Sequence, residues 1–208
     1  TVGSNAGTGG IRYYKNGTAV PTINISSGQL SVYGGITNRT GNAADPFVFN
    51  ITGGSILCNS GTTGTTDPLI HINSNASSSF IMSAGTIVLQ KPNRTGSTIA
   101  DFDLNGTSGT VTVTDGTVQF GNASTAAGAK FSFVPYSGIV QPNFKVSGPS
   151  ASTVSLYTSY ASTSDFKLLS LNIESGKVFD INSISGTAGA TKTMMLTHNF
   201  DGIHGFYN

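Results

Sequence analysis

The chain has 208 residues, including 27 glycines, with 9% charged residues and a formal net charge of +1. This balance, without any cluster of Lys and Arg, excludes the basic surface that a phosphate backbone requires. No apolar run approaches the roughly 20 residues that cross a bilayer. Abundant Ser, Thr and Asn with alternating Val, Ile and Phe indicate many short strands joined by turns. We therefore expect an all-β protein that neither binds nucleic acid nor inserts into a membrane.

Residues 1–22 hold the glycine-rich "TVGSNAGTGG" and are expected to form an irregular leading segment or the end of a preceding coil. From residue 23 onward a motif recurs, as in "INISSGQLSVY". It consists of an alternating apolar pair, a small polar corner that ends in glycine and, in most copies, a second apolar pair. Glycine supplies the positive φ or the tight backbone that such a corner needs.

Six copies of this motif follow one another at spacings of 26 to 32 residues. The corner glycines, the fifth of them in a degenerate copy, are Gly28, Gly54, Gly85, Gly116, Gly148 and Gly176. The apolar pairs ahead of them are Ile23/Ile25, Phe49/Ile51, Phe80/Met82, Val111/Val113, Phe144/Val146 and Leu171/Ile173. A period of this length is typical of a solenoid, a propeller or an array.

Between copies, polar connections lead into a further short apolar stretch such as "PFVF" or "PLIHI". A propeller blade needs four antiparallel strands that pair within the blade, whereas these strands are short and match their equivalents one period later. We therefore predict a right-handed parallel β-helix, a β-solenoid of about six coils with up to three short strands each. It is expected to span residues 23–184, and residues 185–208 are expected to form a last partial coil or a connection to following repeats.

This fold predicts specific neighbours in the core. Because equivalent residues of adjacent coils lie about 4.8 Å apart, Phe49 and Phe80 should stack in one ladder, between Ile23 and Val111. Between residues 147 and 165 the pattern blurs, which indicates either a distorted coil or a slip in the alignment. Apolar anchors remain in this stretch, namely Val154, Leu156, Tyr157 and Tyr160. Any function is expected in the loops that leave the coils.

The segments "FIMSAGTIVLQKPNRTGS" and "FNITGGSILCNSG" resemble the β-helical stalks of exported adhesins from gliding and related Bacteroidetes-type bacteria. The resemblance covers residues 23–184. It implies a secreted or surface-anchored protein at the outer surface of a Gram-negative cell. Further repeats or domains of a longer polypeptide, or a protein that covers the open coil ends, would then be its partners.

Four carboxylates are the candidates for a metal site. Asp101 and Asp103 flank Phe102, so both are expected on one outward strand face, where they could help to hold Ca²⁺ or could simply be solvated. Asp45 and Asp67 each precede a proline at equivalent corners, where a cation could lie between them or each could form its own Asx turn. We assign neither a metal nor a cofactor on this basis.

Some pectin-degrading enzymes are also parallel β-helices, which invites comparison with "DGIHGF" near the end of the chain. Those enzymes bring two or three carboxylates together, whereas no Asp–Asp pair accompanies Asp201 here, and His204 follows isoleucine. His71 is expected to point outward from a strand, and His198 has no partner at metal-ligand spacing. We therefore assign no catalytic residue and predict that the chain is not an enzyme.

Two further residue types remain. The single Cys58 is expected to be a small apolar residue in a strand. Five tyrosines could stack on sugar rings if displayed together, or could cap the core with their hydroxyls in water; they are Tyr13, Tyr14, Tyr136, Tyr157 and Tyr160.

Six coils without converging reactive groups favour a structural and adhesive segment, a stiff stalk whose loops contact surfaces or glycans. A carbohydrate-active β-helix enzyme and a phage tail spike or fibre segment are the alternatives.

Overall fold

The computed structural model of the chain describes residues 10–13, 19–38, 45–59, 68–72, 75–92, 100–104, 109–158, 165–183 and 194–196. Within these ranges the regular elements are β-strands, and the strand pairings are parallel. The described part of the chain contains no helix. The chain is therefore an all-β protein with the parallel β-solenoid fold that its repeat predicts.

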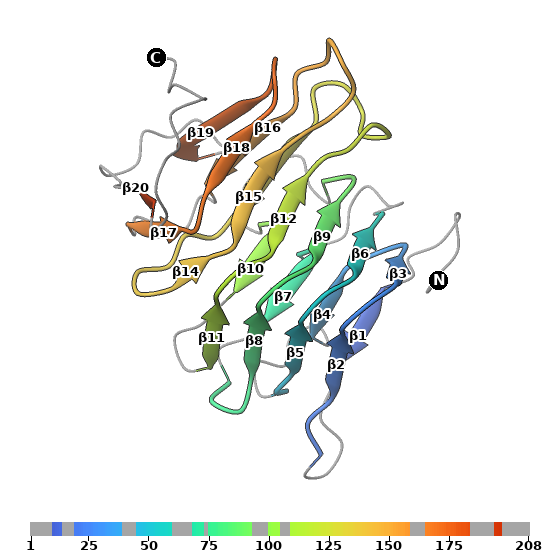
Figure 1. The fold of residues 1–208 in the computed structure, drawn as a ribbon, viewed down its shortest axis with the longest axis vertical. Coiled ribbons are helices and arrows are strands. Elements are labelled where there is room, and N and C mark those ends of the chain that lie inside the picture. Colours follow the sequence, from blue (N-terminus) through green and yellow to red (C-terminus); the bar gives the residue numbers. More distant parts are fainter. Residues whose placement is uncertain are drawn as a thin grey trace.

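Four sheets run along the solenoid (Figure 1). Sheet I contains β2 (Thr22–Ile25), β5 (Val48–Ile51), β8 (Ser79–Met82) and β11 (Thr110–Val113). Sheet II contains β3 (Gln29–Val32), β6 (Ser55–Cys58), β9 (Thr86–Leu89), β12 (Thr117–Phe120), β15 (Asn143–Val146) and β18 (Leu171–Ile173). Sheet III contains β1 (Ile11–Tyr13), β4 (Ile36–Asn38), β7 (Ile70–Ile72), β10 (Phe102–Leu104), β13 (Lys130–Phe133), β16 (Ser155–Thr158) and β19 (Val178–Ser183). Sheet IV contains β14 (Val140–Gln141), β17 (Phe166–Leu168) and β20 (Met194–Leu196).

Each coil adds one strand to three faces in turn: first to sheet I or sheet IV, then to sheet II, then to sheet III. In Figure 1, sheets I and II form the front layer and sheet III lies behind them. The stacked strands of sheet II span about five complete turns, slightly fewer than the six coils that the motif count predicts. The segment 1–22 contains β1, which pairs with β4, and the segment 185–208 contains β20, which pairs with β17.

The predicted core ladder is confirmed. Ile23 pairs with Phe49, Phe49 with Phe80, and Phe80 with Val111, all in parallel register. The rings of Phe49 and Phe80 lie 5.9 Å apart in an edge-to-face arrangement, and Phe102 of sheet III lies 6.2 Å from Phe80. Aromatic contacts therefore join the sheets across the thin core, in addition to the contacts between successive coils.

The corner between sheet I and sheet II is tight and repeats from coil to coil. Gly28, Gly54, Gly85 and Gly116 occupy it, each with a positive φ, directly before strands that pair in register. A methyl group at Gly54 would lie 2.7 Å from the carbonyl oxygen of Gly28 in the coil below. Glycine is therefore required here both for its conformation and because two backbones stack closely.

The alignment of the last two motif copies is wrong by one strand. Phe144 pairs with Val118 and Leu171 pairs with Phe144, so both lie in sheet II, whereas the motif places them in the ladder of sheet I. Gly148 and Gly176 consequently follow sheet II strands, and of these two only Gly176 has a positive φ. An alternating apolar pair can occur on any face of the solenoid, because side chains alternate between the core and the solvent in every strand. The motif alone could not distinguish the faces.

The cause of this slip is a change of sheet in the fifth coil. Sheet I ends at β11, and the next strand on that side, β14, begins sheet IV (Figure 1). Val111 and Val113 are only partly buried as a result, although they face inward. The expected anchors Val154, directly before β16, and Leu156, within β16, are fully buried, whereas Tyr160 lies outside the described residues.

Candidate functional site

Histidine, carboxylate and phenol side chains from three coils meet on the outer side of sheet III. His71 of β7 and Asp103 of β10 are register partners, and His71 Nε2 lies 4.0 Å from Asp103 Oδ2. Tyr136, in the connection between β13 and β14, donates a hydrogen bond of 2.9 Å to Asp103 Oδ1. We call these three residues the His71–Asp103–Tyr136 cluster. His71 therefore points outward from its strand, as the alternation of β7 predicts.

Burial dominates the electrostatics of this cluster. It raises the pKa of Asp103 above its ordinary value of 3.8, although His71 and the Tyr136 hydroxyl act in the opposite direction. Burial, together with the neighbouring Asp103, also raises the pKa of Tyr136. The phenol therefore remains a hydrogen-bond donor to the carboxyl group over the physiological pH range.

The raised pKa of Asp103 predicts a specific pH dependence. The contribution of Asp103 to stability is fully present below its pKa in the unfolded chain and is lost as pH rises through the higher pKa in the folded protein. Asp103→Asn, which stays neutral and can still accept the Tyr136 hydrogen bond, should be more stable than the parent protein at pH 7 and should lose this advantage at pH 3. Urea midpoints at the two pH values measure the difference.

Tyr136→Phe is the matched control for this prediction. It removes the hydrogen bond that lowers the pKa of Asp103, so its stability should fall more steeply with rising pH than that of the parent protein. If Asp103→Asn were less stable than the parent at pH 7, the buried charge would be favourable and the argument wrong.

The other candidate carboxylates do not form a shared solvated face. Asp101 is buried, and its Oδ2 accepts a hydrogen bond of 2.9 Å from the backbone N–H of Ser132 in the next coil. Asp45 is also buried, and Asp67 lies outside the described residues. Among the residues that the structure describes, no group of three or more His, Cys, Asp or Glu is close enough to hold a metal ion.

The tyrosines are not displayed together. Tyr13 is buried in the core, where it stacks on Phe47 at 4.1 Å and donates a hydrogen bond to the carbonyl oxygen of His71. Tyr157 is half-buried on sheet III, and Lys130 Nζ lies 6.0 Å from its ring centre. Besides Asp67, five residues from the sequence analysis lie outside the described part of the chain: Tyr14, Tyr160, His198, Asp201 and His204.

Cys58 lies in β6 and is fully buried, as expected for a small apolar strand residue. Burial raises the pKa of its thiol to about 12. The side chain therefore stays protonated and serves the core as an apolar group.

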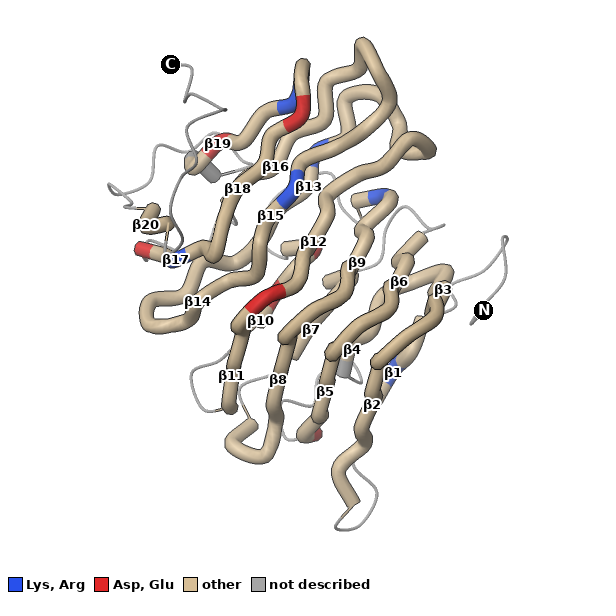
Figure 2. Tube along the Cα trace, in the orientation of Figure 1, with Lys and Arg blue, Asp and Glu red and all other residues tan. Residues whose placement is uncertain are grey.

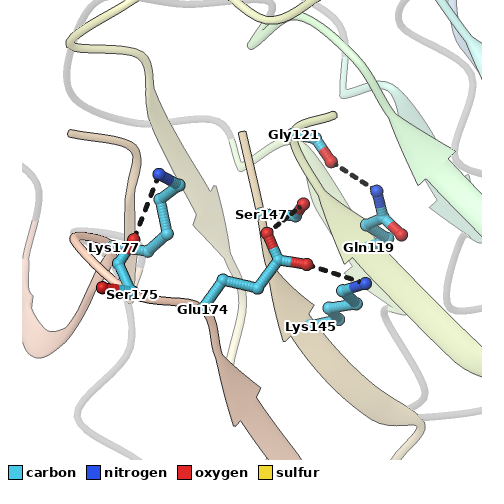
Figure 3. Close-up of polar contacts among 7 residues, drawn as sticks. All are labelled: Gln119, Gly121, Lys145, Ser147, Glu174, Ser175 and Lys177. Carbon is cyan, nitrogen blue, oxygen red and sulfur yellow. Dashed lines mark hydrogen bonds and ion pairs between the residues drawn. The ribbon is translucent and has the colours of Figure 1, made fainter. Parts of the chain in front are cut away.

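Sequence reasoning missed a polar network around the connection between β15 and β16 (Figure 3). Glu174 accepts hydrogen bonds from Lys145 Nζ at 2.9 Å and from the Ser147 hydroxyl at 2.7 Å, and Lys145 lowers the pKa of Glu174. Lys177 is buried and donates to the carbonyl oxygens of Pro149 and Ser152. These contacts tie the connection to the next coil. No sequence spacing indicates the Lys177 contacts, because their carbonyl groups belong to irregular backbone.

Gln141 of β14 is an unusual core residue. It is fully buried beside its register partner Leu168, and within the described part of the chain neither its Oε1 nor its Nε2 has a hydrogen-bond partner. An unsatisfied buried amide costs about 1–3 kcal/mol. Gln141→Leu should therefore raise the free energy of unfolding by a similar amount, measured by urea titration. Leu168→Gln is the control and should lower it; equal or lower stability for Gln141→Leu would contradict this account.

Comparisons of the chain with protein-family models, with curated proteins and with solved structures gave no match. A search of the described residues for a helix long and apolar enough to cross a membrane also found none.

Proposed function

We propose that the chain is a non-enzymatic structural segment, a stiff β-solenoid spacer of a secreted or surface-anchored bacterial protein. The observation that carries this proposal is the in-register stack, whose end residues are less buried than those in its middle. Phe49 and Ile51 are fully buried in the middle of sheet I, whereas their ladder neighbours Ile23 and Ile25 are only partly buried. Solenoid coils are stabilised by the coils next to them, so such ends call for further coils or a covering partner.

The opposite end of the stack supports the same proposal. Leu171 and Ile173 of β18, Phe179 of β19 and Met194 of β20 face the core but are only partly buried. An additional coil or a partner protein would cover them and would pair with the outer edges of these strands. The proposed partners are therefore further repeats or domains of a longer polypeptide, or a protein bound at a coil end.

The described carboxylates also support a structural role. Asp101 binds the backbone of the next coil, and Glu174 holds Lys145. Asp115 accepts hydrogen bonds from the N–H of Gly116 and from the Asn143 amide, which closes a corner and joins two coils. A carboxylate that acts as a general acid or base must instead face a bound substrate.

One observation favours a second candidate, a carbohydrate-active enzyme. The His71–Asp103–Tyr136 cluster gathers three titratable groups from adjacent coils at the outer face of sheet III. Groups of these types serve as acids and bases in catalysis. Within the cluster, however, the Tyr136 hydroxyl is committed to Asp103, which suits a contact between coils, and His71 Nε2 has no hydrogen-bond partner within the described part of the chain.

The test is to incubate the full chain with neutral and with acidic polysaccharides and to measure the release of reducing ends and of unsaturated products. We expect no product, a rod-like particle by small-angle X-ray scattering, and labelling of unpermeabilised cells by antibodies against the chain. Product formation that Asp103→Asn abolishes would establish the enzyme instead. A trimeric mass in sedimentation would favour the tail-fibre alternative.

A further inference from the structure

The strands of sheets I and II contain no charged residue in the first four coils. The exposed Asp115 lies at the corner between β11 and β12, where it accepts hydrogen bonds from the Gly116 N–H and the Asn143 amide. In Figure 2 the strands β2, β3, β5, β6, β8, β9, β11 and β12 contain no acidic or basic residue along their length. The outward residues of sheet II in these coils are Gln29, Ser31, Ser55, Leu57, Thr86, Val88, Thr117 and Gln119. The outer side of sheet III, by contrast, carries Lys130, Asp103 and His71. The two layers of the solenoid therefore present chemically different surfaces.

Two rows of side chains cross the strands of sheet II at right angles. Register places Ser55, Thr86 and Thr117 in one row, which we call the hydroxyl row. Leu57 and Val88 are neighbours in the second row, the aliphatic row. Neighbours within a row lie about 4.8 Å apart, and the two rows are separated by two residues of strand, about 6.6 Å.

The hydroxyl row is not used by the fold. Within the described part of the chain, the side chains of Ser55, Thr86 and Thr117 make no hydrogen bond, and all three are half-buried at the surface. The hydroxyl of Thr125, at a corner, instead binds the carbonyl oxygen of Gln90, and the Tyr136 hydroxyl binds Asp103. The capacity of the hydroxyl row is therefore free for water or for a ligand.

We propose that these two rows bind an extended, uncharged polysaccharide that lies across the strands of sheet II. The hydroxyl row would exchange hydrogen bonds with sugar hydroxyls, and the aliphatic row would contact the C–H faces of the sugar rings. The spacing of the coils is comparable to the length of one sugar unit in an extended chain, so successive coils meet successive sugars. An uncharged surface binds an uncharged polymer without leaving a charge unpaired.

This polysaccharide would be the partner of the structural segment proposed above, on which the inference rests. It would bind to a strand face, not to the loops that the sequence analysis favours. The hydroxyl row by itself would suit many polar partners. The adjacent aliphatic row and the lack of charge select a polymer with alternating hydroxyl and C–H surfaces over an acidic polysaccharide or a nucleic acid.

The experiment measures retention of the full chain on cellulose and chitin powders and its retardation in gels that contain xylan or alginate. Retention or retardation by the neutral polymers but not by alginate is expected. Val88→Lys should weaken binding about tenfold or more, because it places a charge in the aliphatic row. The fold accepts lysine there, since Lys145 occupies the same row two coils further along.

Asn172→Lys is the matched control, because it places the same charge in the same row beyond Lys145. It should leave binding unchanged. Thr86→Val, which removes one hydroxyl with little change in shape, should also weaken binding and provides a second test should Val88→Lys fold poorly.

No binding to any neutral polymer, or equal binding by all variants, would overturn the proposal. A dimer in sedimentation that Val88→Lys dissociates would show instead that this face joins two copies. The structural role depends on the rod shape and on the absence of polysaccharide cleavage. Both are measured separately, so neither result would overturn it.

Discussion

Gly54→Ala is expected to lower the free energy of unfolding by about 3 kcal/mol or more, or to prevent folding. The residue has a φ of +67°, and a Cβ atom there would lie 2.7 Å from both the carbonyl oxygen of Gly28 and the carbonyl carbon of Ser27. Both are backbone atoms of the coil below, so relief requires the two coils to separate. Urea titration followed by circular dichroism measures the loss.

Gly28→Ala separates the conformational effect from the contact between coils. Gly28 has nearly the same φ, +71°, but a Cβ atom there would meet no other atom within 4 Å. Its substitution should therefore cost only the strain of a left-handed residue, about 1–2 kcal/mol. Equal losses for the two variants would mean that conformation alone, without the close contact between coils, determines the need for glycine.

Phe80→Ala should destabilise the protein by about 3–5 kcal/mol, the range for removing a large buried aromatic side chain. Phe80 is fully buried, and its ring makes edge-to-face contacts with Phe49 and Phe102. The cavity would lie between sheets I and III in the middle of the stack, where rows above and below it are held in register. Chemical denaturation measures this change as well.

Phe179→Ala is the control at the end of the stack. Phe179 also faces the core and lies 6.2 Å from the ring of Phe133, but it is only partly buried. Its loss should cost clearly less than the loss of Phe80, because less apolar surface is returned to water. A cost as large as that of Phe80 would indicate that this end is already covered.

The two layers of the solenoid differ in the chemistry of their outer surfaces. Charged and titratable side chains gather on sheet III, whereas sheet II offers uncommitted hydroxyls and aliphatic groups in the first four coils. From the fifth coil onward, Lys145 and Glu174 end this uncharged surface. A partner of the uncharged face would therefore bind the first coils, and the later coils would serve as a spacer.

The fold itself could be predicted from the sequence because successive coils satisfy similar conditions. Each inward pair must be apolar, and in the first four coils the tight corner from sheet I into sheet II needs a residue that tolerates positive φ. The repetition of these conditions placed Phe49 against Phe80 and Gly28, Gly54, Gly85 and Gly116 at equivalent corners. The same reasoning failed for Phe144 and Leu171, because an alternating apolar pair fits the strands of every sheet equally well.

The sequence by itself therefore determined the parallel solenoid, its core ladder and its low content of charged residues, which are properties of the repeated pattern. Only the tertiary structure decided the change from sheet I to sheet IV, the burial of Asp101 and the meeting of His71, Asp103 and Tyr136. These features depend on how far each connection shifts the next strand. Irregular backbone packed against neighbouring coils determines this shift. The repeat pattern of the sequence contains no information about it.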